Sequence, residues 1–262
     1  MKKLRIDIIL VEKGFADDLS LAQRLVMAGK VRVNNQLVLN PSAAYPENVS
    51  IQLAESPRFV SRGGDKLQSA LEVFKIDVTG MTCADVGAST GGFSDCLLQN
   101  GCKRIYAIDV GRGILHWKIR QDPRVNVMEG VNARSLESLP ELIDLVTLDA
   151  SFISSKVLLP VIKGWLNPSS GQVIVLIKPQ FEARKEQTSA GRGVIRDPEI
   201  HKQVLNEVLT FAESEGYQTS GLMRSPVLGP KGNIEFLARC SLLKQPDENL
   251  KYLIDSLFPV EE

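Results

Sequence analysis

A glycine-rich segment directly after a predicted buried strand carries the clearest chemical signal in the sequence. It runs Asp85-Val86-Gly87-Ala88-Ser89-Thr90-Gly91-Gly92-Phe93. Glycines let the backbone turn tightly and approach a ligand at the carboxyl edge of a sheet. The spacing is not GxGxxG, and the segment lacks the Gly-Lys-Ser/Thr of a phosphate-binding P-loop. Asp85 argues against a pyrophosphate here and favours a ligand that carries a cationic group.

A second acidic residue, Asp109, ends the next predicted strand, 18 residues past Gly91. A carboxylate at such a position can accept hydrogen bonds from both hydroxyls of an adenosine ribose. A cationic group and a free ribose together indicate S-adenosyl-L-methionine. The alternative is structural: Asp85 caps the helix that starts near Gly91, and Asp109 is an ordinary strand-end acid. The predicted cofactor contacts, with Asn132 at the adenine edge, are Asp85, Gly87, Ser89, Gly91, Gly92, Phe93, Asp109 and Asn132.

A sheet must position these residues, and the pattern from residue 80 onward predicts one. Strands are expected near 82–87, 104–109, 124–128, 143–149 and 172–178, with helical stretches between them. Alternating strands and helices indicate a parallel sheet with right-handed crossovers. Strands near 218–226 and 232–240 flank a Gly-Pro-Lys-Gly turn and are expected to pair as a hairpin. The fold class is therefore α/β, a Rossmann-like sheet of five parallel strands plus a C-terminal hairpin.

The first 55 residues have a different pattern, typical of a small α+β domain. Apolar residues recur at helical spacing from Leu4 to Val11, and Ser20 to Gln23 has the capping-box spacing that begins a second helix. Short alternating stretches on both sides of Asn34-Asn35 predict a β unit. We therefore expect a domain over 1–55, a linker over 56–61, a larger domain over 62–245 and a helical tail over 246–262.

Several of these segments resemble a known family. Asp85–Phe93 is similar to the cofactor loop of FtsJ-like 2′-O-ribose RNA methyltransferases, and Ser61–Leu67 resembles the lysine-bearing helix before their first strand. Residues 4–55 resemble the S-four RNA-binding domain, first seen in a ribosomal small-subunit protein. The fusion of the two is the architecture of the TlyA (hemolysin A) family, and the resemblance covers roughly residues 3 to 243. It implies a methyltransferase that uses S-adenosyl-L-methionine and modifies ribosomal RNA, with cytidine indicated by the TlyA architecture alone.

The resemblance also implies a catalytic set. Lys66, Asp149, Lys178 and Glu235 match the family's Lys-Asp-Lys-Glu tetrad in order. Methyl transfer to a ribose hydroxyl requires alignment of the reactants and removal of a proton from a weak acid. A lysine accepts that proton only when it is partly neutral, a form that burial and a neighbouring cation favour. Taken singly, each of the four residues is better explained by an ordinary salt bridge, whereas the four together in the family's order favour a functional set.

The tetrad residues are expected to have distinct roles. Lys178 follows five apolar residues, so it should emerge at the carboxyl edge of the sheet as the proton acceptor or hydroxyl-orienting group. Lys66 would position the substrate and favour the neutral form of Lys178. Asp149 would hold Lys178 and face the methyl donor, and Glu235 would complete the hydrogen bonds. Which lysine loses the proton stays open.

Basic residues of the small domain and the linker are candidates for contact with RNA phosphates, which supply affinity and register. They are Arg5, Arg24, Lys30, Arg32, Arg58 and Arg62. A solvated charged face is the alternative. The polar, glycine-bearing residues 182–198 predict a loop, whose cations either close over the RNA or are simply solvated.

Composition and charge exclude several other classes of protein. The 262 residues carry 31 Lys+Arg and 31 Asp+Glu, and 44% are hydrophobic, which excludes a disordered polyelectrolyte. No apolar run approaches the ~20 residues of a membrane span, and acidic residues interrupt the only signal-peptide-like stretch. Four cysteines without CxxC spacing and two isolated histidines argue against a metal site or disulfides, so a cytoplasmic protein without metal is expected.

Three functions from different classes follow. The first is S-adenosylmethionine-dependent 2′-O-methylation of ribosomal RNA, free or within ribosomal subunits. The second is an RNA-binding or ribosome-assembly protein that does no chemistry. The third is a membrane-active hemolysin, against which the absence of a basic amphipathic helix counts. The sequence leaves open the methylated nucleotide and the oligomeric state.

Overall fold

The computed structural model describes residues 3–54, 57–243 and 249–258. The chain divides into two compact units, residues 1–57 and 58–262. The predicted boundaries at 55/56 and 245/246 lie outside the described residues.

The first unit combines two helices with short strands. The helices are α1 (Ile6–Glu12) and α2 (Leu19–Met27). The strands are β1 (Lys3–Arg5), β2 (Val31–Val33), β3 (Gln36–Val38), β4 (Ala44–Pro46) and β5 (Ile51–Leu53). β2 pairs antiparallel with both β3 and β5, and β1 pairs with β4. The core is built from apolar side chains of both helices and β2, among them Ile6, Leu10, Val26 and Val31.

The second helix of this unit begins earlier than predicted. Asp18 is its N-cap, and the Asp18 carboxylate accepts a hydrogen bond from Leu21 N at 2.7 Å. Ser20 lies inside the helix, and Gln23 Nε2 instead donates to the buried Asp7 Oδ2 at 3.0 Å. The capping-box prediction at Ser20 is therefore wrong, because a tertiary contact to Asp7 takes the glutamine side chain.

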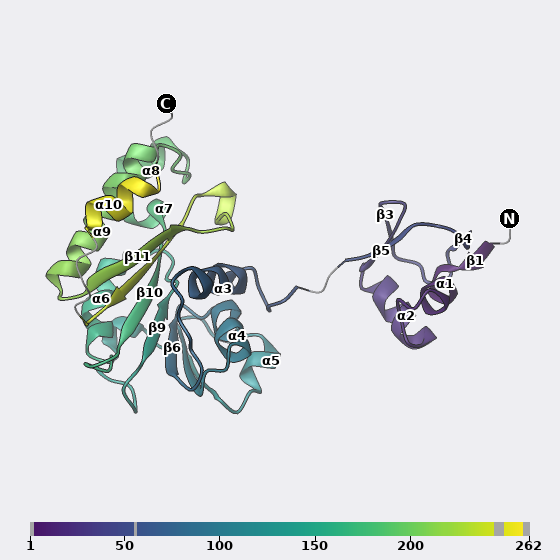
Figure 1. Ribbon diagram of the computed structural model, residues 1–262, viewed down its shortest axis with the longest axis horizontal. Helices are drawn as coiled ribbons and strands as arrows, with labels where there is room; N and C mark the ends of the chain where they lie inside the picture. Colours follow the sequence, from purple (N-terminus) through teal and green to yellow (C-terminus); the bar gives the residue numbers. More distant parts are fainter. Residues whose placement is uncertain (1–2, 55–56, 244–248, 259–262) are drawn as a thin grey trace. The chain divides into compact units, whose positions relative to one another are not determined.

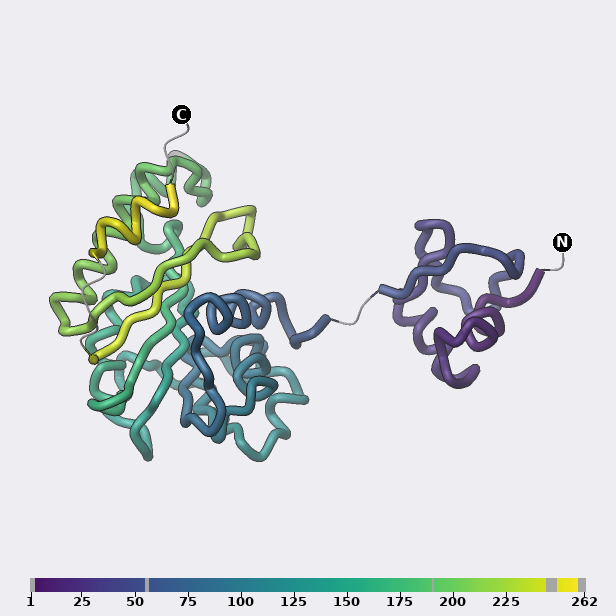
Figure 2. The backbone as a smooth tube through the Cα atoms, viewed as in Figure 1, coloured from purple at the N-terminus to yellow at the C-terminus, as the bar shows by residue number. Residues whose placement is uncertain are grey.

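The second unit contains one seven-stranded sheet in the order β11-β12-β10-β9-β6-β7-β8 (Figure 1). Its parallel strands are β6 (Thr82–Val86), β7 (Arg104–Asp109), β8 (Val125–Glu129), β9 (Leu145–Leu148) and β10 (Gln172–Ile177). β11 (Gln218–Arg224) and β12 (Phe236–Ser241) form an antiparallel hairpin, and β12 also pairs antiparallel with β10. Figure 2 traces the chain from the parallel strands into this hairpin. The predicted five parallel strands and C-terminal hairpin are confirmed.

Helices cover both faces of this sheet, which explains why β6, β9 and β10 are buried throughout and mostly apolar. One face packs against α3 (Gly63–Val73), α4 (Gly92–Gln99) and α5 (Trp117–Arg120). The other packs against α6 (Ser155–Lys163), α9 (Pro198–Ser214) and α10 (Leu250–Ser256), as Figure 1 shows. The shorter helices are η1 (Ala133–Ser135), α7 (Pro179–Glu182), α8 (Lys185–Ala190) and η2 (Pro230–Gly232).

Two segments differ from their predicted character. Phe59 is buried in the core beside α3 and α4, and Val60 N donates to Asp95 Oδ2 at 2.9 Å, so these residues of the expected linker pack on the second unit. The expected loop over 182–198 contains α8, and only 183–184 and 191–197 lie between helices. The strand order reverses between β6 and β9, and ligands of open α/β sheets bind at the carboxyl ends of strands at such a point.

Candidate active site

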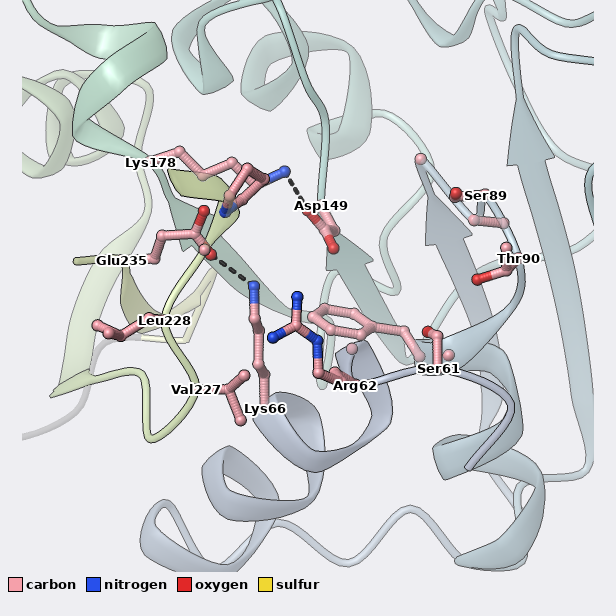
Figure 3. Close-up of a pocket in the computed structure, with 17 residues that line it drawn as sticks. Ser61, Arg62, Lys66, Ser89, Thr90, Asp149, Lys178, Val227, Leu228 and Glu235 are labelled. Carbon is pink, nitrogen blue, oxygen red and sulfur yellow. Dashed lines mark hydrogen bonds and ion pairs between the residues drawn. The ribbon is translucent and has the colours of Figure 1, made fainter. Parts of the chain in front are cut away.

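Four ionisable side chains from distant parts of the chain meet at the carboxyl ends of the parallel strands. Asp149 follows β9 directly, Lys178 follows β10, Lys66 lies on α3, and Glu235 precedes β12. Lys66 Nζ donates to Glu235 Oε2 at 2.5 Å, across 169 positions of sequence. Lys178 Nζ forms an ion pair with Asp149 Oδ1 (Figure 3). The structure thus brings all four predicted catalytic residues together as two neighbouring ion pairs.

The two pairs differ in their exposure to solvent. The Lys66 and Glu235 side chains are 10% and 0% exposed, whereas Lys178 is 9% and Asp149 24% exposed. Lys178 Nζ also donates to Ser151 Oγ at 3.0 Å and to Ala150 O at 3.2 Å. Desolvation raises the pKa of Asp149 above its ordinary value, against the opposing effect of the Lys178 ammonium. The Asp149 pair is therefore the one open to an incoming substrate.

A cavity of about 340 Å³, here called the tetrad cavity, is lined by all four residues. Its other walls come from the start of α3, the glycine-rich segment and the turn before η2. Figure 3 shows Arg62, Val227 and Leu228 around the two ion pairs. Arg62, predicted as an RNA contact, therefore lies at the cavity that holds the tetrad.

A second cavity, of about 390 Å³ and here called the Asp109 cavity, adjoins the first. Asp109 and Asn132 both line it. Asp109 Oδ1 accepts from Gly111 N and Asp109 Oδ2 accepts from Ser89 N, each at 2.7 Å. Two backbone amides thus fix this carboxylate, and each oxygen keeps lone pairs for further donors. The arrangement fits two hydroxyls of a ribose.

The two cavities share Gly87, Ser89 and Asp149 as lining residues. Gly87 has φ +83°, and a Cβ on it would overlap Asp149 O. Only glycine therefore lets the glycine-rich segment approach the end of β9 so closely. A ligand in the Asp109 cavity that extends past Gly87 would therefore reach Asp149, which also lines the tetrad cavity.

Two predicted cofactor contacts lie elsewhere. Asp85 is fully buried and lines neither cavity, because Ser94 Oγ (2.6 Å) and Thr147 Oγ1 (3.0 Å) donate to its carboxylate. Burial raises the pKa of Asp85 to about 6. Gly91 is the left-handed N-cap of α4 and packs towards Leu115. Asp85 and Gly91 therefore support the backbone of the glycine-rich segment. For Asp85 this role is close to the alternative considered from the sequence, in which its carboxylate caps the helix that starts near Gly91. Gly92 and Phe93 do line the tetrad cavity.

Other residues of the site carried no signal in the sequence. The Gln180 side chain is buried, and its Nε2 donates to Glu235 Oε1 at 3.1 Å. Gly229 packs against Glu235, where a Cβ would overlap the carboxylate. Phe152, 91% exposed with φ +64°, lines the Asp109 cavity and packs on Phe181. The positive φ of a bulky residue indicates local strain, which a sequence does not reveal.

The predicted RNA contacts of the first unit are spread over several elements. Arg5 pairs with the buried Asp7 at 2.6 Å, so part of its charge is compensated. Arg24 donates to Ser20 Oγ, and Arg32 donates to Asn35 O; both side chains are exposed. Lys30 is half-buried after α2. In the second unit, the Arg58 guanidinium lies 4.9 Å from the centre of the Phe59 ring.

No group of three or more His, Cys, Asp or Glu side chains in residues 3–54, 57–243 and 249–258 has the arrangement of a metal site. In the same ranges, no helix has the length and hydropathy needed to cross a membrane.

Comparison with known proteins gives two family matches. Residues 59–240 match the FtsJ-like methyltransferase family, and residues 4–48 match the S4 domain. The chain is 40% identical over 239 residues to the 16S/23S rRNA (cytidine-2′-O)-methyltransferase TlyA of Mycobacterium tuberculosis, covering 90% of this chain and 88% of TlyA. It is 38% identical over 238 residues to Hemolysin A of Brachyspira hyodysenteriae, covering 90% and 98% of the two chains.

Solved structures agree with these matches. A protein from Streptococcus thermophilus, provisionally named a hemolysin, has 41% identity and a TM-score of 0.73, covering 98% of this chain and 96% of that one. A provisionally named S-adenosylmethionine-dependent methyltransferase from Listeria monocytogenes, at 17% identity and a TM-score of 0.51, shares the fold and covers 69% and 98%.

Proposed function

The chain belongs to the FtsJ-like methyltransferase family, and from that premise we propose that it transfers a methyl group from S-adenosyl-L-methionine to a ribose 2′-hydroxyl of ribosomal RNA. One observation carries the proposal. The Asp109 cavity and the tetrad cavity meet at Gly87, Ser89 and Asp149, so a donor site and an acceptor site are continuous. Proximity of this kind accounts for much of the acceleration in group transfer.

The Asp109 cavity is the proposed site of the cofactor. Asp109, fixed by two backbone amides, would accept hydrogen bonds from the ribose hydroxyls, and Asn132, which lines the same cavity, would contact the adenine edge. Ser89 and Gly87 would contact the part of the cofactor nearest Asp149. The cofactor supplies an already activated methyl group, so the protein's part in the chemistry concerns the acceptor.

The tetrad cavity is the proposed site of the target ribose. Lys178, held by Asp149, Ala150 O and Ser151, would orient the hydroxyl and accept its proton. Lys66 would position the sugar from the other side, with Glu235 balancing its charge in a fully buried setting. Asp149, at the junction of the cavities, would keep Lys178 aligned with the donor.

The first unit supports RNA as the substrate, because residues 4–48 match the S4 domain. Its candidates for phosphate contacts are Arg5, Arg24, Lys30 and Arg32. Ribosomal RNA and cytidine come from the relatives named TlyA, one of which is a 23S rRNA (cytidine-2′-O)-methyltransferase of Campylobacter jejuni. Such a substrate implies a cytoplasmic enzyme.

The decisive experiment measures transfer of a labelled methyl group to ribosomal RNA and to isolated ribosomal subunits, followed by mass-spectrometric mapping of the product. We expect Lys178→Ala to lower the rate constant about 10²–10⁴-fold, the range of a general base. Lys178→Arg keeps the positive charge but does not release a proton near neutral pH, so it should be nearly as inactive.

Calorimetric titration with the cofactor should give similar affinities for the wild type and both variants. Cofactor binding without any transfer would instead identify a non-catalytic RNA-binding protein. Lysis of red cells by detergent-free protein would favour the hemolysin alternative. A Lys178→Ala enzyme as fast as the wild type would remove the proposed mechanism.

A further inference from the structure

The buried side chain of Asn233 joins two turns beside the tetrad cavity. Its Oδ1 accepts a hydrogen bond from Ile195 N, and its Nδ2 donates to Gly193 O and to Pro230 O, all at 3.0 Å. Asn233 is 2% exposed. One amide group therefore fastens the segment 191–196 to the turn η2, which begins at Pro230.

The segment 191–196 is anchored at a second point. Ile195 O lies 3.1 Å from Nε2 of the buried His201 on α9. The side chains of Val194 and Ile195 are also buried. Both backbone polar groups of Ile195 are thus satisfied by side chains, so this stretch is a fixed part of the surface.

Each of the two joined turns presents an exposed cation on an unusual backbone. Arg192 has φ +52° and Lys231 has φ +57°, both in the left-handed region. A bulky residue keeps such a conformation only where its surroundings enforce it, and such strain concentrates at functional sites. Lys231 Nζ lies 3.8 Å from the position of a Cβ on Gly193, the neighbour of Arg192, so the ammonium of one turn lies close to the backbone of the other.

The charges on these turns are not compensated. Among the described parts of the chain, Arg192, Arg196 and Lys231 have no carboxylate within 4.0 Å, whereas Arg104, Arg120 and Arg124 each have one. All three are exposed. Gly229 and Pro230, at the start of the η2 turn, line the tetrad cavity. Lys231 therefore directly follows a residue that lines the proposed acceptor site, and Asn233 ties the segment of Arg192 and Arg196 to the same turn.

We propose that Asn233 is a positioning residue that joins Arg192, Arg196 and Lys231 into one contact surface for the phosphates that flank the target nucleotide. The inference rests on the proposed function, because it takes RNA as the substrate. Phosphate contacts fix the register of a nucleic acid without reading its sequence. Glu235 follows Asn233 by two residues, so the same short segment links the phosphate contacts to the tetrad.

The first test removes the two strained cations together, as Arg192→Gly/Lys231→Gly. Glycine relieves the left-handed backbone, so the variant should fold at least as well as the wild type. We expect affinity for deproteinised ribosomal RNA and for ribosomal subunits to fall about tenfold. The slope of log affinity against log salt should become shallower by about two units, one for each lost phosphate contact. Cofactor affinity should not change.

A matched control removes two cations away from both cavities, as Lys75→Gly/Lys103→Ala. Lys75 also has a positive φ, +52°, and neither residue lines a cavity. The change in net charge is therefore the same, and one of the two control positions is likewise relieved of a left-handed backbone. This variant should retain the affinity and the salt dependence of the wild type. An equal loss in both variants would reduce the effect to net charge and overturn the proposal.

The second test, Asn233→Ala, keeps every charge but removes the side-chain hydrogen bonds that join the segment 191–196 to the η2 turn. We expect the KM for RNA to rise more than kcat falls, with a shallower salt slope and unchanged cofactor affinity. A purely structural residue would lower Tm without moving the salt slope. Unchanged RNA affinity and salt slope in Arg192→Gly/Lys231→Gly would refute the proposal that these cations contact RNA phosphates. If the double variant weakens RNA binding but the wild type transfers no methyl group to any ribosomal RNA, the surface stands and the proposed function fails.

Discussion

The Asp109 cavity and the tetrad cavity share a border but are built on different principles. In the first, backbone amides of Ser89 and Gly111 fix the Asp109 carboxylate. In the second, charged side chains hold one another, as Lys66 with Glu235 and Lys178 with Asp149. Backbone donors cannot exchange partners without refolding, whereas side-chain ion pairs can. The contrast suits a cofactor that must be held and an acceptor hydroxyl that must lose a proton.

We expect activity to be most sensitive to substitution of Gly87, which lines both cavities. Gly87→Ala places a Cβ against Asp149 O and forces a residue other than glycine to φ +83°. We expect kcat/KM to fall at least 10³-fold, because both cavities lose their shared wall. Steady-state methyl transfer measures the effect. Gly80→Ala is the matched control, since Gly80 has φ +76° but nothing within 4 Å of a Cβ. A milder loss in Gly87→Ala than in Gly80→Ala would contradict the shared border.

A variant on the acceptor side should act on kcat. Glu235→Gln leaves Lys66 without its carboxylate in a buried setting, so we expect kcat to fall about 10²-fold and the free energy of unfolding to fall by about 3 kcal/mol. Cofactor affinity should stay within twofold. The control is Glu141→Gln, which breaks the more exposed pair with Arg104. If Glu235→Gln mainly weakened cofactor binding, the assignment of the two cavities to cofactor and target ribose would be contradicted.

A variant on the donor side should act on affinity instead. Asp109→Asn removes the charge from the proposed acceptor of the ribose hydroxyls, and hydrogen bonds to charged groups contribute about 1.5–3 kcal/mol. We expect cofactor affinity to fall about tenfold or more, with kcat at saturating cofactor close to that of the wild type. Isothermal titration and saturation kinetics separate the two. Loss of kcat with intact affinity would reverse the proposed roles of the cavities.

The smallest expected effect concerns Asp85, which supports the glycine-rich segment from below. Burial raises the pKa of Asp85 to about 6, from 3.8, so the folded protein binds its proton more tightly than the unfolded chain. This group's contribution to stability therefore decreases as pH rises from about 4 to about 6 and is constant above. Ser94→Ala removes a donor to the carboxylate.

We expect Ser94→Ala to lose about 1 kcal/mol more stability at pH 7 than at pH 4, because the hydrogen bond is stronger to the ionised form. Urea unfolding at both pH values measures it. Cofactor affinity at pH 7 should change little. An equal loss at both pH values would mean that Asp85 keeps one protonation state in the folded protein across this range.

The sequence predicted the elements of the second unit well because their signals are local. Five consecutive apolar residues before Lys178 are buried as β10, and the Gly-Pro-Lys-Gly turn separates β11 from β12. Asp109 likewise ends its strand as expected. A buried parallel strand must be apolar on both faces, so its length and its end can be read from composition.

The rest of the site depends on contacts between distant segments. Asp85 is enclosed because Thr147, 62 residues away, and Ser94 both point at it, and no local pattern distinguishes that arrangement from a ligand contact. Gly229 and Gln180 both contact Glu235, which lies far from Gln180 in the sequence. The N-cap of α2 was misplaced by two residues because Asp18, and not Ser20, accepts from a backbone amide, while Gln23 reaches the distant Asp7. Tertiary contacts such as that of Gln23 override local patterns.

β12 lies between β10 and β11 and is preceded directly by Glu235, so the tetrad cavity is completed late in protein synthesis. Lys66 leaves the ribosome early, and its partner Glu235 follows 169 positions later. Domains fold as units from the N-terminus as the chain emerges. The nascent polypeptide can thus acquire its RNA-binding module long before a functional pocket exists, and truncation ahead of the last strand would yield a binder with an unfinished reaction centre.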